Sequence, residues 1–593
     1  MGPGFYYTGS PELEYTEQQN DESERDDGLA QRSEDTRDRH GEIVRVAGGN
    51  PMLGVIRLSA SHRRPRLHAA KKKGRRGRYA GAMKIALSVR DFLDRAETVY
   101  GDRVGIVDEP DQPAEGWGEL TYSRMAELAR AQAAGLDEQG IGFGERVAIV
   151  SHNAARLMVS LFGVSGYGRV CVPINFRLKQ DEISYIVEHC GATMLLIDPE
   201  LADALAGVEC RHRYVIGAES DDALYRFGVE PEPCFPDEED TATINYTSGT
   251  TARPKGVQMT HRSLWLNATT FGWAAGVSDR DVYLHTLPMF HCNGWGMPYA
   301  VSGAGARHIV LRKVDGEEIL RRVERHGVTY MCGAPAVVAA VLDAAQDWEG
   351  EIPGSGRVRM TVAGAPPPTR TIERMETELG WEFMQLYGLT ETAPYLTMNR
   401  RRAEWDNLNP AERAVKLSRQ GVPALGISLD VDESGEALAR GNHVMTGYWE
   451  QPEESAKALA GGWFHTGDGG YIDEEGYLTL SDRKKDVIIS GGENVSSIEV
   501  EDALFAHEAV AEAAVIGVPD EKWGETVKAL VVLAPGASAT EADLIQHCRS
   551  RLAHYKCPTS VEFRDELART ATGKLQKYRL REPYWASQDR GIN

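Results

Sequence analysis

The sequence predicts a layered α/β fold followed by a smaller α+β domain, on three observations. The chain has 593 residues, of which 42% are hydrophobic, and this is enough for one large core and a second, smaller one. From Val89 onward, short apolar runs alternate with amphipathic stretches, a pattern typical of helices layered on a sheet. After Lys485 the pattern changes to that of a compact unit. We therefore expect a large N-terminal α/β domain and a small C-terminal domain.

The elements of the large domain follow one another in a regular alternation. Short buried apolar runs indicate strands, and longer amphipathic stretches indicate helices. The predicted elements are a strand at 146–150, a helix at 155–166, and strands at 169–173, 308–311, 358–362 and 383–386. We place this domain at residues 83–483.

The small C-terminal domain is predicted at residues 484–593. Its size of about a hundred residues is usual for an independent domain. The predicted elements are a strand at 487–489, a helix at 497–506, strands at 513–518 and 527–533, and a final helix from near Ala542. The charged segment at 482–485 before it is the predicted linker.

Residues 1–82 differ in composition from the rest of the chain. An acidic stretch around residues 21–38 passes into a basic run at residues 71–78. Charge-blocked sequence of this kind buries too little apolar surface to offset chain entropy, so we predict a disordered extension. A tether to anionic lipid or nucleic acid, and a translation start at Met83, are the alternatives.

Charge and composition exclude several functions. The formal net charge of -22 argues against a general nucleic-acid binder, because such proteins need clustered Lys and Arg. No apolar run approaches the roughly 18 residues of a membrane span, and the eight cysteines form no C-x-x-C pair. We expect reduced thiols, a cytoplasmic location and small-molecule partners, with no nucleic acid and no transmembrane segment, and we leave a homodimer open.

The segment from Tyr246 to Gly256 has the composition of a phosphate-binding turn. It reads Tyr-Thr-Ser-Gly-Thr-Thr-Ala-Arg-Pro-Lys-Gly and follows a strand-like run at 242–245. Backbone N–H groups, hydroxyl donors and a lysine can converge there on phosphate oxygens. The spacing differs from that of nucleoside triphosphatases, because Lys255 is followed by Gly256 and no Ser or Thr follows. These residues by themselves indicate phosphate binding.

Five motifs in order resemble the adenylate-forming superfamily of acyl-CoA synthetases, peptide-synthetase adenylation domains and firefly luciferase. The resemblance covers about residues 88–580 and implies a large adenylation domain with a mobile C-terminal domain. It also implies a two-step reaction, in which a carboxylate attacks the α-phosphorus of ATP, expels pyrophosphate and then passes its acyl group to a thiol. The motifs are Thr247-Ser-Gly-Thr-Thr251 with Lys255, Tyr387-Gly-Leu-Thr-Glu391, Thr466-Gly-Asp468, Asp482-Arg483 and Thr572-Gly-Lys574.

The resemblance implies a role for each nucleotide motif. Asp468 corresponds to the carboxylate that accepts from both ribose hydroxyls, and Arg483 to a second ribose contact. Tyr387 and the run Gly364-Ala365-Pro366 correspond to the two walls around adenine. The nucleotide-binding residues implied are, in full, Thr247, Ser248, Gly249, Thr250, Thr251, Lys255, Gly364, Ala365, Pro366, Tyr387, Gly388, Thr390, Asp468, Arg483 and Lys485.

A Mg²⁺ ion and a catalytic lysine are also implied. In the family the metal is held by the residue that matches Glu391 and by a hydroxyl that matches Thr247 or Thr250, and one carboxylate suits an ion that keeps several waters. Lys574 corresponds to a lysine that contacts the carboxylate and the α-phosphate during adenylation only, and its ordinary pKa of about 10.4 makes it a cation at neutral pH. We count Lys574, Glu391, Thr250 and His291 as catalytic candidates.

The segment at 288–295, Pro-Met-Phe-His-Cys-Asn-Gly-Trp, bears on the acid substrate. Adenylation domains for amino acids place an Asp near here, whereas this segment offers His291 and no carboxylate. A neutral or apolar acid is therefore favoured. The segment looks like that of medium- and long-chain fatty acyl-CoA synthetases, in which a tryptophan, here Trp295, gates the acyl tunnel.

The second half-reaction involves the small domain. In the family, the loop that corresponds to Gly491 and Gly492 swings to the active site, and the glycine that matches Gly492 lines the pantetheine channel. Lys485 takes the position of the hinge. The cofactors implied are ATP, Mg²⁺ and coenzyme A.

Two places depart from the family pattern. Ala252 replaces the usual glycine of the phosphate loop, and an alanine at φ > 0 would cost on the order of 1 kcal/mol. Between Leu429 and Glu436 a hairpin looks shortened, which predicts a missing strand pair close to Asp468.

The sequence therefore predicts an AMP-forming fatty acyl-CoA synthetase. A fatty acyl-AMP ligase that feeds a carrier protein is the alternative within enzymes, but no inserted segment of that kind lies between Gly421 and Gly491. An aryl-acid:CoA ligase is a further alternative. A non-catalytic acyl or nucleotide sensor would be expected to have lost Lys574 or Glu391, and both are present.

Overall fold

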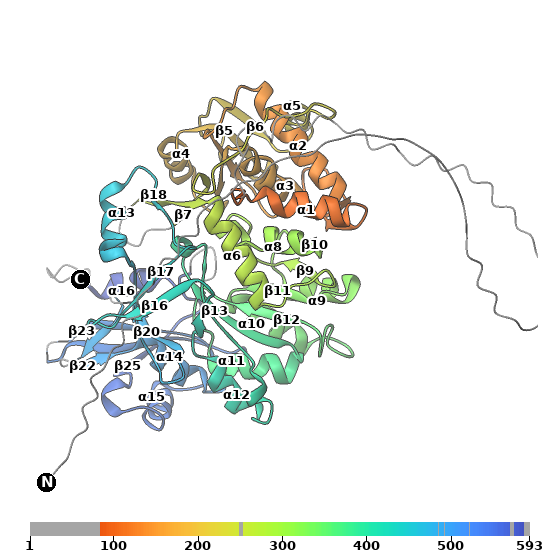
Figure 1. Cartoon of the computed structure of the whole chain (residues 1–593). Helices are drawn as coiled ribbons and strands as arrows, with labels where there is room; N and C mark the ends of the chain where they lie inside the picture. Colours follow the sequence, from red (N-terminus) through yellow and green to blue (C-terminus); the bar gives the residue numbers. More distant parts are fainter. Residues whose placement is uncertain are drawn as a thin grey trace, which may run out of the picture. The chain divides into compact units, whose positions relative to one another are not determined.

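The structure is a computed structural model that describes residues 84–247, 253–483, 486–490, 493–520, 522–569 and 575–585 (Figure 1). The side chain of Arg483 is not among the parts described. The prediction for residues 1–82 lies outside these residues. None of the helices in the described ranges is long and apolar enough to cross a membrane. A cytoplasmic location and a homodimer remain predictions.

A nine-stranded sheet forms one layer of the fold. Its strand order is β15-β14-β13-β12-β11-β9-β10-β1-β2, and the run from β13 to β1 is parallel throughout. Parallel strands align their carboxyl ends, so the loops after β12 and β13 leave the sheet at one edge. The strands are β1 (Val104–Val107), β2 (Glu119–Thr121), β9 (Val282–His285), β10 (Arg307–Val310), β11 (Tyr330–Gly333), β12 (Arg359–Val362), β13 (Glu382–Gly388), β14 (Tyr395–Arg400) and β15 (Val422–Pro423).

Helix α9 shows how the sequence makes the elements that cover this sheet. The Asp315 side chain caps its first turn by accepting from the backbone N–H of Glu318, and Gly327 ends it at φ 65°. Its buried residues Ile319, Leu320 and Val323 follow helical spacing and join a core with the strands. The helices beside this part of the sheet are α9 (Gly316–His326), α10 (Pro335–Gln346), α11 (Thr369–Arg374) and α12 (Pro410–Leu417) (Figure 1).

A seven-stranded sheet forms a second layer, in the order β18-β8-β7-β4-β3-β5-β6. Strands β7, β4, β3, β5 and β6 run parallel, while β8 and β18 are antiparallel to their neighbours. The strands are β3 (Arg146–Val150), β4 (Val170–Ile174), β5 (Ala192–Ile197), β6 (His212–Val215), β7 (Thr241–Thr247), β8 (Lys255–Thr260) and β18 (Gly447–Tyr448). The predicted strands at 146–150 and 169–173 are therefore confirmed.

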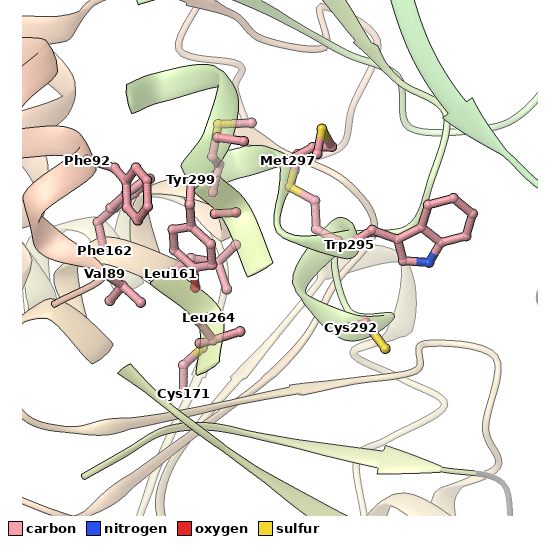
Figure 2. Close-up of a cluster of buried hydrophobic side chains, with 14 of the residues drawn as sticks. Val89, Phe92, Leu161, Phe162, Cys171, Leu264, Cys292, Trp295, Met297 and Tyr299 are labelled. Carbon is pink, nitrogen blue, oxygen red and sulfur yellow. The ribbon is translucent and has the colours of Figure 1, made fainter. Parts of the chain in front are cut away.

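The largest apolar core joins both sheets to several helices. It contains Phe92 of α1, Phe162 of α3, Leu264 of α6, Tyr299 of α8 and Cys171 of β4 (Figure 2). The predicted helix at 155–166 is confirmed as α3, which ends at Gly163 and is followed by a short 3₁₀ turn. The remaining helices of this part are α1 (Arg90–Tyr100), α2 (Tyr122–Glu138), α3 (Ala155–Gly163), α4 (Gln180–His189), α5 (Ala218–Leu224), α6 (His261–Ala274), α7 (Cys292–Trp295), α8 (Met297–Ala304) and α13 (Pro452–Ala458).

A four-stranded antiparallel sheet corrects one prediction. Its strands are β16 (Ile427–Val431), β17 (Glu436–Gly441), β19 (Phe464–Ile472) and β20 (Leu478–Arg483). The strand pair predicted to be missing near Asp468 is present, because β16 and β17 form a tight hairpin around Gly435, which turns at φ 79°. The loop is short, and the sheet beside Asp468 is complete.

Where the structure describes it, the C-terminal part has a sheet and three α-helices. Its strands are β21 (Ile488–Ser490), β22 (Glu493–Val495), β23 (Val510–Asp520), β24 (Gly524–Leu533) and β25 (Ser560–Phe563), and its helices are α14 (Ser497–Phe505), α15 (Glu541–Arg549) and α16 (Lys577–Trp585). The helix expected to be the last is α15, so α16 is a correction. Helix α16 is rich in Lys and Arg and lacks an apolar run, but Leu580 and Tyr584, four residues apart, pack beside Ala514 and Ile516.

Candidate active site

Tyr387 and Asp468 meet in the structure although 81 residues separate them. The Tyr387 hydroxyl donates a hydrogen bond of 2.8 Å to Oδ2 of Asp468. Asp468 is 8% exposed and lies on β19, where its register partner on β20 is Arg483. The predicted adenine wall, the predicted ribose carboxylate and the backbone of the second predicted ribose residue therefore lie together.

Two glycines shape the loops that leave the parallel strands here. At Gly388 an added Cβ would lie 1.6 Å from the carbonyl oxygen of Pro394, so only glycine allows this approach. Gly364 takes φ 94° just after β12, which pairs in parallel with the strand that carries Tyr387. The run Gly364-Ala365-Pro366 therefore leaves the sheet next to Tyr387, as two facing walls require.

Lys255 and Glu391 lie on either side of Tyr448. The Lys255 ammonium is 4.9 Å from the centre of the Tyr448 ring and forms an ion pair with Glu454. The Tyr448 hydroxyl donates to Oε1 of Glu391 at 2.9 Å. Burial is the main cause that raises the pKa of Tyr448, and the neighbouring Glu391 carboxylate adds to it. The structure thus places the predicted phosphate cation and the predicted metal ligand around one aromatic residue.

Tyr448 and Glu454 were missed by the sequence analysis. Tyr448 reaches the site because β18 pairs antiparallel with β8, opposite Val257, and Glu454 follows on α13. The local signal is a Gly-Tyr-Trp run before Pro452, which is typical of many turns. Pairing between segments almost two hundred residues apart cannot be derived from that run.

Thr247 is the last described residue before the phosphate segment. It ends β7 and pairs with Lys255 at the start of β8, and its hydroxyl lies 3.5 Å from the Lys255 carbonyl oxygen. One residue earlier, the Tyr246 hydroxyl lies 2.8 Å from Nδ1 of His189. The two strands therefore bring Thr247 and Lys255 together at the mouth of the predicted phosphate loop.

On the acyl side, His291 directly precedes α7 and Trp295 is its last residue. Trp295 is buried, and His291 is partly exposed at the residue before the helix. The Cys292 thiol donates to the Thr390 hydroxyl at 3.2 Å, so this segment contacts the residue next to Glu391. Burial raises the pKa of Cys292 to about 12, which keeps it a thiol at neutral pH.

A buried polar cluster joins β20 to the C-terminal helices. Asp482 accepts from the backbone N–H of Ser497 at 2.8 Å and from its hydroxyl at 2.5 Å. Lys577 of α16 donates to the same hydroxyl and pairs with Glu501 at 2.8 Å. The sequence analysis named Asp482 as part of the linker and of the Asp482-Arg483 motif, and it assigned no role to Ser497, Lys577 or Glu501. The cluster therefore ties the first residue of α14 to Asp482, which precedes the predicted hinge.

Several predicted residues lie outside the described residues, so their roles stay predictions. They are Ser248, Gly249, Thr250, Thr251, Lys485, Gly491, Gly492 and Lys574, together with the side chain of Arg483. Among the residues that are described, no three His, Cys, Asp or Glu side chains are grouped to hold a metal ion. Any metal at Glu391 would depend on oxygen atoms of water or substrate, as Mg²⁺ commonly does.

The arrangement has the groups that a nucleotide needs. Tyr387 offers an aromatic ring near the carboxyl end of the parallel strand β13, where open α/β sheets bind ligands, and Asp468 of the antiparallel sheet offers a carboxylate beside it. Lys255 offers a cation for phosphate, and Glu391 offers a carboxylate for a bound cation.

Comparison with known protein families decides which nucleotide chemistry this is. Residues 93–449 match the model of the AMP-binding enzyme, and residues 499–574 match that of the AMP-binding enzyme C-terminal domain.

The chain belongs to the AMP-binding enzyme family. Similar members include the 2-methylpropanoate–CoA ligase of Humulus lupulus, 38% identical over 83% of this chain and 94% of its own length. The 4-hydroxybutyrate–CoA ligase 2 of Metallosphaera sedula is 37% identical over 83% of this chain and 93% of its own length.

Solved structures of the family agree in fold. An anthranilate CoA ligase in complex with anthranoyl-AMP matches with a TM-score of 0.76 at 27% identity, over 85% of this chain and 98% of that one. A fatty acyl CoA synthetase of Mycobacterium tuberculosis matches with a TM-score of 0.63 at 31% identity, over 84% of this chain and 99% of that one. These matches confirm the predicted family and the predicted fold.

Proposed function

We propose that the protein is an ATP-dependent, AMP-forming CoA ligase that activates an aliphatic fatty acid through its acyl-adenylate. The observation that carries this proposal is the arrangement around Tyr448, with Lys255 at its ring and Glu391, the last residue of the Tyr387 motif, at its hydroxyl. A phosphate cation and a metal-binding carboxylate are the two groups that phosphoryl chemistry requires.

The first half-reaction is the attack of the acid's carboxylate on the α-phosphorus of ATP, with pyrophosphate leaving. Asp468 and Tyr387 hold the nucleoside, so the α-phosphorus is presented at a fixed place. Lys255 stabilises charge on the phosphate oxygens, and Lys574 neutralises the charge that develops at the α-phosphate. Because Lys255 is paired with Glu454 here, ATP must compete with that carboxylate for the cation.

Mg²⁺ fits the donors present at this site. Glu391 offers one carboxylate, whose orientation is fixed by the Tyr448 hydroxyl. Thr247 offers a hydroxyl at the end of β7, directly before the phosphate loop. A hard cation prefers such oxygen ligands. When bound, Mg²⁺ neutralises the charge of the phosphate oxygens.

The second half-reaction transfers the acyl group from AMP to the thiol of coenzyme A, which forms the thioester bond and releases AMP. We assign the domains to residues 83–483 and 484–593, with Lys485 as the hinge. Gly491 and Gly492 line the path of the pantetheine arm. Asp482 precedes the hinge at Lys485 and Ser497 follows it. Their hydrogen bonds hold α14, the first helix of the small domain, in one of the two domain orientations of the reaction.

The acid is aliphatic and of short to medium length. Residues 288–295 hold no carboxylate to pair an amino group, and Trp295 presents a buried aromatic wall. The 2-methylpropanoate and 4-hydroxybutyrate ligases named above are similar over most of this chain, which supports an aliphatic acid over an aromatic one. The fatty acyl CoA synthetase of Mycobacterium tuberculosis also supports an aliphatic acid.

A pyrophosphate-release screen tests this assignment. The panel contains unbranched acids from acetate to hexadecanoate, 2-methylpropanoate, benzoate, cinnamate and alanine, each with and without coenzyme A. We expect the highest kcat/KM for an aliphatic acid of short or medium length. An amino acid or an aromatic acid as the best substrate would show that the substrate assignment is wrong.

A further inference from the structure

The turn that carries Trp295 has an unusual backbone. All five residues from Cys292 to Gly296 have positive φ, between 47° and 80°, and three of them are not glycine. The dihedral angles of Asn293 (φ 51°, ψ 43°) are those of a left-handed helix. For L-amino acids this conformation costs roughly 1–2 kcal/mol per residue. Strain of this kind persists only where the surroundings fix it, and it often marks a functional element.

Asparagine side chains fix the turn at its middle. Asn293 is fully buried, and its Nδ2 donates to the Thr243 hydroxyl at 2.9 Å. Asn245 donates to the carbonyl oxygen of Phe290 at 3.0 Å and lies 3.5 Å from Oδ1 of Asn293. The Thr243 hydroxyl in turn donates to Oδ1 of Asn245 at 3.1 Å. Each of these polar groups is buried and paired, which makes the network costly to break.

A third asparagine fixes the end of the turn. Asn267 of α6 donates to the Trp295 carbonyl oxygen at 3.2 Å and accepts from the Tyr395 N–H at 3.1 Å. An added Cβ at Gly296 would lie 2.5 Å from Nδ2 of Asn267. Both the middle and the end of the turn are therefore held by amide groups from neighbouring elements.

The turn does more than fill the core. Figure 2 shows the indole of Trp295 directed away from the labelled rings of Phe92, Phe162 and Tyr299. The turn begins at the residue after His291, and its Cys292 thiol contacts Thr390. The residues that face the acid in the proposed function are thus attached to a strained, immobilised backbone.

The network also links this turn to the phosphate segment. Thr243 and Asn245 lie on β7, two residues apart, and Thr247 follows after two more, so all three lie on one face of the strand. Strand β7 leads directly into the predicted phosphate loop. One face of β7 therefore contacts the turn that carries Trp295, through Thr243 and Asn245, and leads to the phosphate loop through Thr247.

We propose that Asn293 is a positioning residue that fixes the wall of the acyl site by tying the left-handed turn to Thr243 and Asn245 of β7. Its amide sets where Trp295 lies relative to the phosphate segment, and so determines which acids reach the α-phosphorus. This inference rests on the proposed function. It assigns acid selectivity to a buried amide that touches no substrate itself.

The test compares Asn293→Gly with the native enzyme. Glycine tolerates φ > 0, so this variant removes the amide without adding backbone strain. We expect the KM for the acid to rise roughly tenfold or more, because small displacements of a bound reactant cost that much. We also expect the ratio of kcat/KM for butanoate to that for octanoate to change at least threefold (roughly 0.6 kcal/mol), while the KM for ATP stays within a factor of about two.

Two further variants make the result decisive. Thr243→Val removes the partner of the Asn293 amide at nearly constant side-chain volume and should shift the same kcat/KM ratio. It keeps the inference testable if Asn293→Gly does not fold. Asn399→Ala is the matched control, because Asn399 is a buried asparagine that donates to the carbonyl oxygens of Lys416 and Arg419. This control should lower the melting temperature and leave the ratio unchanged.

Three outcomes would overturn the inference. The first is an unchanged acid ratio in both Asn293→Gly and Thr243→Val. The second is a loss of acid and ATP affinity in equal proportion. The third is an equal shift in Asn399→Ala, which would mean that general destabilisation explains the effect. A native enzyme that activates no acid would contradict the proposed function instead, and so the two failures are distinguishable.

Discussion

The nucleotide side and the acyl side of the site are held by different interactions. On the nucleotide side, charged groups lie at partly exposed positions: Lys255 forms an ion pair with Glu454, and Glu391 accepts a hydrogen bond from the Tyr448 hydroxyl. On the acyl side, neutral amides and hydroxyls are fully buried, as Asn293 and Thr243 are. The ion pair of Lys255 can be exchanged for ATP, because exposed ion pairs are weak. The buried groups of the acyl side cannot exchange partners in this way, because a buried unpaired amide is costly.

This difference explains how one site can treat two substrates differently. ATP carries several negative charges and replaces Glu454 as the partner of Lys255. An apolar acid offers no charge beyond its carboxylate, so only the shape of a fixed wall can select it. Variants on the two sides should therefore separate the ATP dependence from the acid dependence.

The largest effect is expected from two residues that act in different half-reactions. Replacing Lys574 by Ala removes a cation at the reacting phosphate, so adenylation should fall by roughly 10² to 10³ or more, while thioester formation from a supplied acyl-adenylate survives. Replacing Gly492 by Leu should block the pantetheine path, so acyl-AMP accumulates. Single-turnover assays of each half-reaction measure both effects, and Lys457→Ala, an exposed lysine on α13, is the control. Equal loss of both steps in both variants would contradict alternation between two domain orientations.

Asp468 should show the next largest effect, confined to ATP. Asp468→Asn keeps the size of the side chain but loses the charge that accepts from ribose, and hydrogen bonds to charged groups contribute about 1.5–3 kcal/mol. The KM for ATP should rise by roughly 10- to 100-fold and the acid ratio should not change. Tyr387→Phe removes only the donor to Asp468 and should have a smaller effect in the same direction. A change in the ratio of kcat/KM for butanoate to that for octanoate would show that the nucleotide side also influences acid selectivity.

Tyr448→Phe tests the hydroxyl that orients Glu391. The ring under Lys255 remains, but the 2.9 Å hydrogen bond to the carboxylate is lost. A hydrogen bond to a charged group contributes about 1.5 kcal/mol or more, so half-saturation by Mg²⁺ should need roughly tenfold more metal. A Mg²⁺ titration of ATP binding, followed by intrinsic tryptophan fluorescence, measures this without turnover. An unchanged Mg²⁺ titration would show that the Tyr448 hydroxyl does not orient Glu391 for metal binding.

Glu454→Gln should give the smallest effect, and in the opposite direction. Releasing Lys255 from its ion pair should lower the KM for ATP by a factor of a few, and added salt should reduce the difference from the native enzyme. The neighbouring Glu453→Gln is the matched control because Glu453 lies on the same first turn of α13. A higher KM for ATP in Glu454→Gln would mean that Glu454 supports ATP binding rather than competing with it.

The sequence predicted the strands of the parallel sheets well because they are buried on both faces. Runs such as Val-Ala-Ile-Val at the end of β3 allow no other location. The motifs gave Asp468, Tyr387, Lys255 and Glu391, since each belongs to a family pattern. Helix α16 was missed, because its apolar positions are too few to form a run.

The residues that the sequence missed are those whose role depends on long-range pairing. Tyr448 reaches Glu391 because a two-residue strand pairs with β8, and Asn293 finds Thr243 across 50 residues of chain. Neither residue has a local pattern that differs from an ordinary turn. The prediction for the hairpin at Gly435 was wrong because a short loop was interpreted as a missing strand pair, whereas β16 and β17 are both present.

The route of oxygen atoms tests the central claim most directly. With an aliphatic acid labelled with oxygen-18 at both carboxyl positions, attack of the carboxylate on the α-phosphorus leaves one labelled oxygen on AMP when coenzyme A takes the acyl group. The account therefore predicts AMP that carries one oxygen-18 atom, in equal amount to a thioester that keeps the other. Mass spectrometry of both products after complete turnover measures this. Unlabelled AMP, or label in free phosphate together with ADP, would contradict an acyl-adenylate intermediate.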